Sequence, residues 1–489
     1  MRQLSTPPRQ LTPDGSYPRR WSALVALLLA EAMNLLDATI VQVAAPAIHA
    51  DLGGSVSDIQ WFTTAYTLPF AVLLITGGRL GDIAGRRRLF VLGVVGFTVA
   101  SLACALAPGV GFLIAFRAVQ GASAALVIPQ TIGLIKAMFA SDEMSRALGS
   151  IGPVMGLAAV CGPVLGGVLT HADLLNSSWR AVFLINVPVA LAVLALSPQL
   201  PRNRAPKRPT LDLTGTLLAM TGTGLLVFPL IGSDISRLSG RSWTTVTAGL
   251  LTLTAFALHQ RRVATTGRSP SLEPTLFTRP GFPAALVAST TFFAVTTGLM
   301  TVVVLQLQLG LGVGVLKAGL TLAPWSVGLA VSSWAAGAHL VRGYGQRVML
   351  AGLGVLLAGM LCAILAYDRA VPGAYPTWLL PALGVVGLGA GLFTPAFFTH
   401  ALKPLRTQEL GSAAGLLNAV QQLGATLGVA VLGSVYLANA GAGGGAGSGV
   451  GGGTEGASGA LYGVQVAFWS AVGLVGVCAG ASWVMGRER

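Results

Sequence analysis

The feature that most constrains this fold is a series of long apolar stretches separated by short polar ones. A helix that crosses a bilayer needs about 20 mostly apolar residues, and fourteen stretches meet that rule. They cover 21–48, 60–79, 89–107, 111–138, 147–170, 180–198, 211–232, 243–260, 282–309, 317–341, 348–367, 377–402, 411–438 and 461–484. Only 9% of the 489 residues are charged, against about 25% in soluble proteins. The sequence therefore predicts an all-α integral membrane protein with fourteen transmembrane helices.

Basic residues set the expected orientation of these spans. Of the 30 Lys and Arg residues, all but six lie in the N-terminal tail, in alternate loops or at the C-terminus. Short cytoplasmic loops carry the excess of basic residues in membrane proteins. We therefore expect both termini in the cytoplasm, which an even number of spans also requires. The net charge of +14 is then a topology signal, and no nucleic-acid partner is expected.

Segments in the two halves of the chain resemble each other. The loop Gly78–Arg88 (GRLGDIAGRRR) returns as Gly337–Arg347 (GAHLVRGYGQR), with Leu80, Gly85 and Arg87 matching Leu340, Gly345 and Arg347. Span four likewise matches span twelve, and span five matches span thirteen, at nearly the same separation. Parallel repeats of six helices are one build of secondary transporters. The predicted parts are a disordered cytoplasmic tail at 1–20, a six-helix bundle at 21–205, two inserted helices at 206–270 and a second six-helix bundle at 271–489.

Five motifs resemble those of a known family. They are Gly78–Arg88 between spans two and three, Leu36–Val41 (LDATIV) in span one, Arg117–Gly121 (RAVQG) in span four, Gly162–Gly167 (GPVLGG) in span five and Trp179–Pro188 (WRAVFLINVP) at the start of span six. Together they resemble the major facilitator superfamily, and within it the fourteen-helix drug:proton antiporters. The resemblance implies a fold of two six-helix bundles with two further helices between them.

Asp37 and Arg117 are the first candidates for chemistry. Asp37 lies nine residues before Pro46, and Arg117 lies nine residues after Pro108. At 1.5 Å per residue, both sit about 14 Å from the outer face. Charged residues inside a membrane usually have a partner and a function, so an ion pair is expected. The family resemblance marks Asp37 as the proton carrier and Arg117 as its coupling partner, and a static structural pair is the alternative.

Glu31 is the other acid well inside a span. It lies six residues before Asp37, which puts it about 120° round the helix and about 9 Å deeper. It therefore faces either a central cavity or a neighbouring helix. Its role is either a second protonatable site that also attracts cationic substrate, or a permanently protonated, hydrogen-bonded carboxyl.

Other polar and aromatic residues are candidates for a substrate cavity. Asn34 and Gln120 share helix faces with Asp37 and Arg117, and either orient that pair or make ordinary bonds between helices. Asn418, Gln421 and Gln422 form an i, i+3, i+4 set in span thirteen, which is either a binding surface or a packing contact. Tyr66, Gln306, Gln308, Trp325 and Trp334 complete the candidates.

Two glycine-containing motifs predict conformational roles. Gly78, Asp82, Gly85 and Arg86 are expected at a cytoplasmic gate, where Asp82 meets the start of span thirteen near Gly411. The alternative is that this loop only retains topology through its arginines. Gly162, Pro163, Gly166 and Gly167 predict a helix that bends or packs tightly between the bundles. The repeat has Arg342 where the first loop has Asp82.

These residues predict a proton-coupled antiporter that exports a lipophilic small molecule across the plasma membrane by alternating access. Its partners are the substrate, protons and the bilayer, it acts as a monomer, and it uses a proton gradient without a cofactor. No catalytic site, metal site or Walker motif is found, so no enzyme activity is expected. The alternatives are an exporter dedicated to one endogenous metabolite or antibiotic, an uncoupled facilitator or importer, and a membrane receptor. With two acids inside the spans, we expect a neutral, zwitterionic or monocationic substrate.

Overall fold

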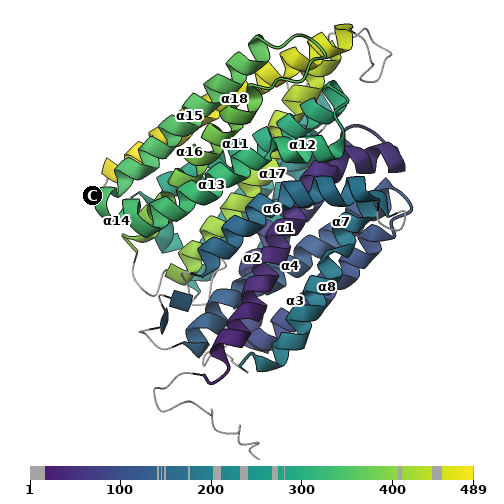
Figure 1. The fold of residues 1–489 in the computed structure, drawn as a ribbon. Helices are drawn as coiled ribbons and strands as arrows, with labels where there is room; N and C mark the ends of the chain where they lie inside the picture. Colours follow the sequence, from purple (N-terminus) through teal and green to yellow (C-terminus); the bar gives the residue numbers. More distant parts are fainter. Residues whose placement is uncertain are drawn as a thin grey trace, which may run out of the picture.

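A computed structural model describes most of the chain and gives it a helical architecture. The described residues are 17–139, 143–144, 146–147, 150–173, 177–201, 211–231, 240–266, 274–279, 281–405, 410–442 and 454–487. Most of the predicted tail at 1–20 lies outside them. Figure 1 shows the helices running side by side along one common direction.

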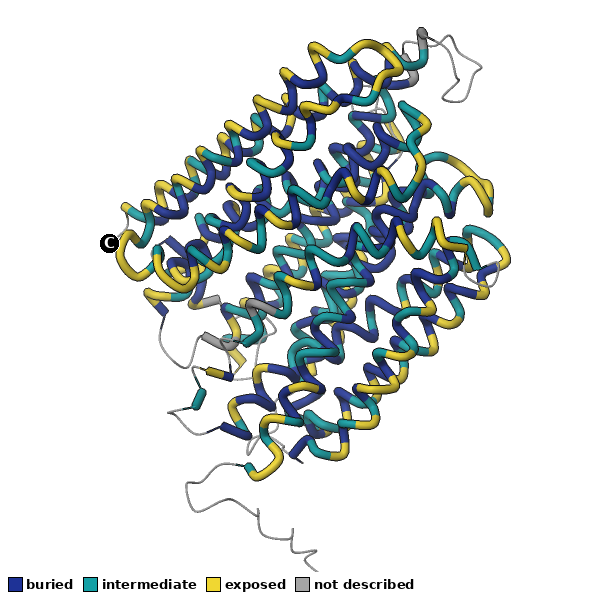
Figure 2. The backbone as a smooth tube through the Cα atoms, in the orientation of Figure 1, coloured by how far each residue is buried: buried dark blue, intermediate teal, exposed yellow. Residues whose placement is uncertain are grey.

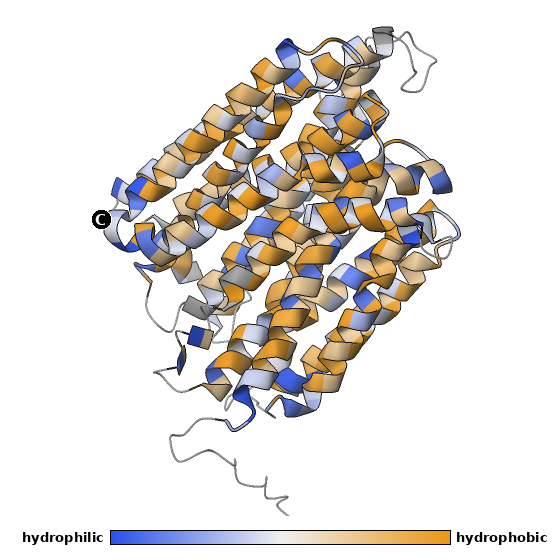
Figure 3. Cartoon of the chain, in the orientation of Figure 1, coloured by the Kyte–Doolittle hydropathy of each residue, from blue (hydrophilic) through white to orange (hydrophobic). Residues whose placement is uncertain are grey.

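Residues 20–199 form what we call the first helix set. Its polar groups gather near the helix ends while apolar residues cover the flanks (Figure 3), as a chain surrounded by lipid requires. Its helices are α1 (Arg20–Leu52), α2 (Asp58–Ala84), α3 (Arg86–Ala105), α4 (Val110–Met138), α6 (Ile151–Ala172), the 3₁₀ turn η2 (Ser178–Arg180), α7 (Ala181–Leu184), α8 (Asn186–Leu196) and the turn η3 (Ser197–Gln199).

Residues 282–487 form the second helix set. Buried positions line the helix sides that face one another, and exposed positions face outwards (Figure 2). Its elements are α11 (Phe282–Leu305), the π-helical η7 (Gln306–Gly310), α12 (Val315–Thr321), α13 (Ala323–Ala335), the π-helical η8 (Ala336–Leu340), α14 (Val341–Tyr344), α15 (Gln346–Asp368), α16 (Leu379–Leu402), α17 (Leu410–Ala442) and α18 (Thr454–Arg487).

Matching glycines pack the two sets in the same way. In α4, a methyl group at Gly121 would collide with the backbone carbonyl of Tyr66 in α2. In α16, a methyl group at Gly387 would collide with the backbone carbonyl of Trp325 in α13. Both contacts need a residue without a side chain, because the helices approach backbone to backbone. The matching positions in the two sets support the predicted duplication.

The repeated loop also has the same backbone geometry in both copies. Gly85 ends α2 with φ 101°, and Gly345 ends α14 with φ 51°. Residues with a side chain rarely adopt positive φ, so glycine is needed at both turns. The next helix begins immediately after each glycine.

In the sequence, two further helices stand between the two sets, and we call them the inserted pair. They are α9 (Leu213–Val227), continued by the 3₁₀ turn η4 (Phe228–Leu230), and α10 (Gly240–Thr265). Thirteen helices in the described part of the chain are long and apolar enough to cross a membrane, and α10 is not one of them. Its threonine hydroxyls are hydrogen-bonded within the helix: Thr247 and Thr252 each donate to a carbonyl one turn earlier in α10. Hydroxyls bonded within the helix leave no polar group unsatisfied in lipid.

Asp212 joins the two inserted helices. Its carboxylate caps α9 by accepting from the Gly215 N–H at 2.8 Å, and it lies 2.8 Å from His259 Nε2 and 2.6 Å from Gln260 Nε2 of α10. Burial raises the pKa of Asp212, but these hydrogen bonds outweigh it and hold the pKa below its usual range. The inserted pair packs on the helix sets mainly through the contact of α9 with α2.

Three hydrogen bonds link the two helix sets towards the end where α1 stops and α2 starts, which is the predicted outer end. Thr67 and Thr426 join their hydroxyls at 2.7 Å, Ser434 donates to Gln60 at 3.3 Å, and Gln308 donates to the Val43 carbonyl at 2.7 Å. Ser434 also donates to the Leu230 carbonyl of η4 at 2.7 Å. The inserted pair therefore contacts both sets at this end.

Candidate functional site

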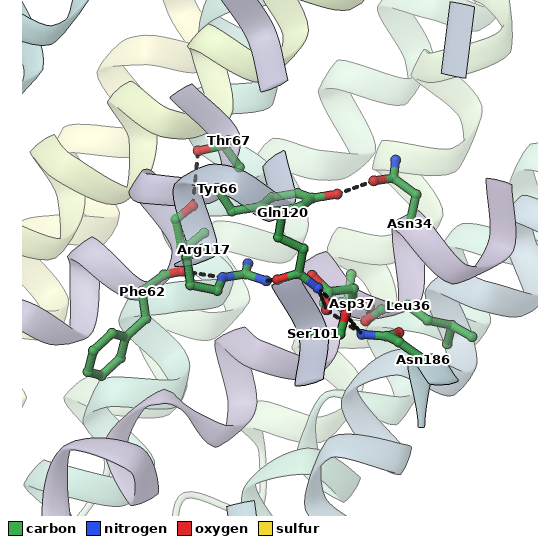
Figure 4. A network of polar contacts seen from close by, with 12 residues as sticks. Asn34, Leu36, Asp37, Phe62, Tyr66, Thr67, Ser101, Arg117, Gln120 and Asn186 are labelled. Carbon is green, nitrogen blue, oxygen red and sulfur yellow. Dashed lines mark hydrogen bonds and ion pairs between the residues drawn. The ribbon is translucent and has the colours of Figure 1, made fainter. Parts of the chain in front are cut away.

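A buried ion pair lies in the interior of the first helix set. Arg117 NH1 of α4 donates to Asp37 Oδ2 of α1 at 2.5 Å, and both side chains are 0% exposed. Figure 4 shows the two side chains pointing toward each other from different helices. The depth estimated from Pro46 and Pro108 thus matches the observed pairing.

Two side-chain amides also bind the Asp37 carboxylate. Gln120 Nε2 of α4 donates to Asp37 Oδ1 at 2.8 Å, and Asn186 Nδ2 of α8 donates to the same oxygen at 2.7 Å. The Ser101 hydroxyl of α3 accepts from both amides, at 2.8 Å from Gln120 and 3.2 Å from Asn186. The carboxylate is therefore held directly by residues of α4 and α8, and α3 supports it through the Ser101 contacts to both amides (Figure 4).

Arg117 is held on its other side by α2. Its Nε donates to the Phe62 carbonyl at 2.9 Å, and its guanidinium carbon lies 4.4 Å from the centre of the Tyr66 ring. NH1 also donates to Gln120 Oε1 at 2.7 Å. NH2 is buried and has no hydrogen-bond partner among the described residues. The two N–H groups of NH2 are therefore not used by the described residues.

Small residues allow these helices to come close enough for the network to form. Gly121, one turn along α4 from Arg117, packs against the Tyr66 backbone. Gly162 and Gly166 of α6 pack against Thr39 and Ile40 of α1, two and three residues after Asp37. Side chains at these positions would push α1, α2, α4 and α6 apart and separate the donors from the carboxylate.

The electrostatic character of the network follows from its burial. One acid and one base cancel in net charge, but each would be costly to leave unpaired in an apolar interior. Charge-assisted hydrogen bonds are stronger than neutral ones, and Asp37 accepts three of them. The arrangement therefore stabilises the ionised pair, and loss of the charge on Asp37 would leave Arg117 without its ionic partner.

Glu31 lies apart from this pair. It is 9% exposed and its carboxyl lies beside Thr131 of α4. Of the two surroundings expected from the sequence, the structure gives the neighbouring helix. Asn34, between Glu31 and Asp37, accepts a hydrogen bond from the Tyr66 hydroxyl. Tyr66 therefore contacts Arg117 with its ring and α1 with its hydroxyl.

The other predicted cavity residues are scattered. Gln120 belongs to the Asp37 network itself. Gln306 is fully buried within the second helix set, where it accepts from the Tyr436 hydroxyl at 3.2 Å. Trp325 is 7% exposed and packs its backbone on Gly387, while Trp334 is 64% exposed, so the place of Trp334 in a cavity stays a prediction. Half-buried positions on α17 hold the remaining three candidates, Asn418, Gln421 and Gln422.

The predicted gate residues form a compact corner at the end of α2. Arg86 donates to Asp82 at 2.8 Å and lies across Gly133 of α4, where a methyl group would meet its guanidinium. Gly78 faces Pro129 of α4, and Gly85 makes the turn into α3. The contact expected between Asp82 and α17 near Gly411 stays a prediction.

The glycines of α6 contact two helices. Gly162 and Gly166 face α1, whereas Gly167 lies against the backbone of Val315 and Leu316 in α12. The Pro163 carbonyl faces Gly319 of the same helix. The predicted position of this helix between the two bundles therefore matches its contacts.

Sequence reasoning missed Asn186 and Ser101 as members of the network. Asn186 stood inside the motif quoted for span six, so a polar residue in an apolar helix was the available signal. Ser101 is a single hydroxyl in an apolar run and gave no signal. Among the described residues, no group of three His, Cys, Asp or Glu side chains gathers as a metal site.

Comparison with known proteins gives consistent matches. The sequence model of the family described as Major Facilitator Superfamily matches residues 27–429. The "Probable actinorhodin transporter" of Streptomyces coelicolor is 44% identical over 431 residues, which cover 87% of this chain and 75% of that protein. The "Puromycin resistance protein" of Streptomyces alboniger is 35% identical over 492 residues, covering 97% of this chain and 93% of that protein.

A third relative and a solved structure agree with these. The "Multidrug resistance protein Stp" of Mycobacterium tuberculosis is 32% identical over 425 residues, covering 85% of this chain and 75% of that protein. The crystal structure of a bacterial homolog to the human lysosomal transporter Spinster, inward-facing and unoccupied, superposes with a TM-score of 0.69. Its identity is 18%, and the match covers 97% of this chain and 99% of that one. At that identity the likeness concerns the fold, and it confirms the predicted all-helical architecture.

Proposed function

We propose, from the premise that the chain belongs to the Major Facilitator Superfamily, that it is a proton-coupled exporter of a lipophilic small molecule. Membership makes it a multi-pass membrane transporter of a small molecule rather than an enzyme. The relatives named for resistance to puromycin and to multiple drugs support export of drug-like compounds. We place it in the plasma membrane as a monomer, with both termini in the cytoplasm.

The observation that carries the proposal is the buried pair of Asp37 and Arg117. Asp37 is fully buried, ionisable and held on a different helix from its basic partner. A proton that binds Asp37 removes one of the two charges, and the attraction between α1 and α4 falls with it. Protonation can therefore change the relative stability of two arrangements of the helices. A fully apolar interior would have no such response.

The proposed cycle alternates between two states. In one, Asp37 is ionised, bonded to Arg117, Gln120 and Asn186, and the predicted outer end is closed by the Thr67–Thr426 and Gln60–Ser434 contacts. A proton from outside enters when that end is open, neutralises Asp37 and permits return to the inward-facing state. Substrate binding on the cytoplasmic side accompanies proton release, so that one moves out as the other moves in.

The substrate is expected to be neutral, zwitterionic or monocationic. Asp37 is committed to Arg117, which leaves Glu31 as the acid deep in the described spans without an ion-pair partner. A dicationic compound would therefore lack a second carboxylate. An exporter dedicated to one metabolite made by the same cell is the second candidate, favoured by the 44% identity to the "Probable actinorhodin transporter".

Transport in reconstituted vesicles tests the proposal. The purified full chain is placed in liposomes with an imposed pH gradient, and uptake of puromycin and of a lipophilic cationic dye is measured with internal pH. We expect gradient-driven transport of at least one compound, with coupled proton movement. Asp37→Asn should abolish the gradient-driven component, because it cannot exchange a proton at that position.

A matched control separates this effect from general damage. Asp368→Asn changes an exposed acid at the end of α15, and it should transport at the wild-type rate. Gradient-driven transport that persists undiminished in Asp37→Asn would rule out Asp37 as the proton carrier. Transport that runs equally well without any gradient, in the wild type, would favour an uncoupled facilitator instead.

A further inference from the structure

Asn186 occupies an unusual place for a residue of α8. It is 1% exposed, and its helix begins at Asn186 after α7 ends at Leu184. Pro188 lacks an N–H and cannot donate to the Leu184 carbonyl, so the helical ladder is interrupted at this point. Phe183 and Asn186 are three residues apart and share one helix face, which is turned toward Arg117 and Asp37.

Asn186 and Gln120 meet the same carboxylate oxygen in different ways. Gln120 is anchored at both ends of its amide, because Oε1 accepts from Arg117 while Nε2 donates to Asp37 and Ser101. Asn186 comes from outside the Arg117 helix and brings an independent donor at 2.7 Å. The two amides therefore fix Asp37 Oδ1 from two directions.

An amide N–H can donate to a carboxylate but cannot accept a proton from a carboxylic acid. Its bond therefore favours the charged form of Asp37 over the neutral one. Ser101 accepts the second hydrogen of each amide and so keeps both –NH₂ groups turned toward Asp37. The neutral residues of α3 and α8 thus bear on the protonation of an acid in α1.

We infer that Asn186 is a positioning residue that sets the pH range over which Asp37 takes up its proton, and that Ser101 holds the Asn186 amide in its donating orientation. This inference rests on the proposed role of Asp37 as the proton carrier. It assigns a task to span six, whose sequence motif otherwise has no chemistry in the transport cycle. Asn186 acts through Asp37 and does not itself carry the proton.

Other titratable groups facing Asp37 must be accounted for. In the described part of the chain they are Arg117 on α4, Tyr66 on α2 and Cys104 on α3. None of these is changed by a substitution at Asn186. Glu31 lies on the same helix as Asp37, six residues earlier and about 9 Å deeper. A change in the pH profile after substitution of Asn186 therefore reports on Asp37 and its hydrogen bonds.

The test is the pH profile of gradient-driven transport by the full-length protein, with puromycin or the dye as the transported probe. Asn186→Leu keeps the side-chain size but removes the donor. A hydrogen bond to a charged group is worth enough to move a protonation midpoint by about 1–2 pH units. The midpoint should move to higher pH by that amount. Ser101→Ala should move it in the same direction by less.

Asn186→Asp provides a second variant of nearly identical shape. Two carboxyl groups at hydrogen-bond distance favour sharing one proton, so the midpoint should rise further than in Asn186→Leu. The matched control is Asn439→Leu in α17, where the amide donates to the Val435 carbonyl of its own helix and to no other described residue. The control should keep the wild-type midpoint.

The outcomes separate this inference from the proposed function. An unchanged or lowered midpoint in Asn186→Leu, or in Asn186→Asp if the first variant fails to insert, would overturn the inference while Asp37→Asn remains inactive. Full gradient-driven transport in Asp37→Asn would instead overturn the proposed function. A purely structural role for Asn186 would lower the amount of protein or the maximal rate and leave the midpoint in place.

Discussion

The first and second helix sets are packed alike but differ in what they bury. Gly121 meets the Tyr66 backbone in the first set, and Gly387 meets the Trp325 backbone in the second. One turn earlier in each helix, the first set has Arg117 and the second has Leu383, both fully buried. The duplicated positions thus preserve the backbone contact, while the side chain four residues away has changed from a cation to an aliphatic group.

An aromatic stack lies in the interior of the second set. Phe292 of α11 stacks on Phe393 of α16 with ring centres 4.0 Å apart, and Phe393 stacks on Phe397 at 5.3 Å. Stacked rings change little with proton concentration, whereas a carboxylate paired with a guanidinium responds directly. The comparison teaches that close packing and proton response are separable properties. Only the first set, among the described residues, buries an Asp–Arg pair.

The largest expected effect comes from replacing Arg117 of the first set by leucine, the residue found at the equivalent position 383 of the second set. Arg117→Leu leaves the Asp37 carboxylate buried without its ionic partner, and breaking such a pair costs about 3–5 kcal/mol. Gradient-driven transport should be lost and the thermal unfolding temperature should fall. Adding Asp37→Asn to Arg117→Leu should recover most of the stability but none of the transport. A volume-conserving Leu383→Met change in the second set should cost less than about 1.5 kcal/mol.

Locking the two sets together should also stop transport. The Thr67 and Thr426 hydroxyls lie 2.7 Å apart across the sets, whereas the Thr76 and Thr216 hydroxyls lie 2.9 Å apart between α2 and α9. In a background without native cysteines, oxidised Thr67→Cys/Thr426→Cys should block vesicle transport, and a reductant should restore it. Oxidised Thr76→Cys/Thr216→Cys should transport normally if the inserted pair moves with the first set. Equal inhibition by both disulfides would show that the inserted pair does not move together with the first set.

Equivalent glycines should respond equally in the two sets. Gly121→Ala and Gly387→Ala each force a methyl group onto a backbone carbonyl, and such overpacking costs about 1–3 kcal/mol. Thermal unfolding of the two variants should show losses of similar size. Gly354→Ala is the control, because its position has nothing within 4 Å and helix propensity favours alanine there. A loss confined to one set would break the structural equivalence.

Much of the fold follows from the sequence, because a membrane span is dictated by length and apolarity. The ends of α11 and its π-helical continuation fall at Phe282 and Gly310, against the predicted 282–309. The predicted span 243–260 corresponds to α10, which is not among the thirteen described helices that are long and apolar enough to cross a membrane. Its threonines bond to carbonyls of their own helix. A hydropathy scale counts those hydroxyls as polar, although each is hydrogen-bonded to a carbonyl of α10 itself.

The sequence could predict a contact in the site only where the depths of two residues along their helices were enough to pair them. Asp37 and Arg117 were matched by their distances from Pro46 and Pro108. Asn186 stood out as a polar residue, but placing it beside Asp37 needed knowledge of the rotation of α8 about its axis, which the otherwise apolar sequence of that helix does not reveal. For the same reason the sequence does not show which side of its helix Trp334 occupies, and the structure leaves this side chain 64% exposed. In a membrane, lipid-facing and protein-facing sides are both apolar, so the hydrophobic pattern does not distinguish them.

The smallest expected effect concerns the duplicated loop. Asp82 bonds to Arg86 at 2.8 Å, and both side chains are partly exposed at 28% and 26%. An i,i+4 ion pair on a helix surface contributes about 0.3–0.5 kcal/mol, so Asp82→Asn should barely change the unfolding temperature. If Asp82 also meets α17 during the cycle, the transport rate should fall while stability and insertion stay normal.

Arg342→Gln is the matched change in the second loop, which has no acid at that place, and it should leave the rate unchanged. A wild-type rate in Asp82→Asn would mean that the first loop, like the second, serves topology alone, because its one distinguishing charge would then have no effect on the conformational change.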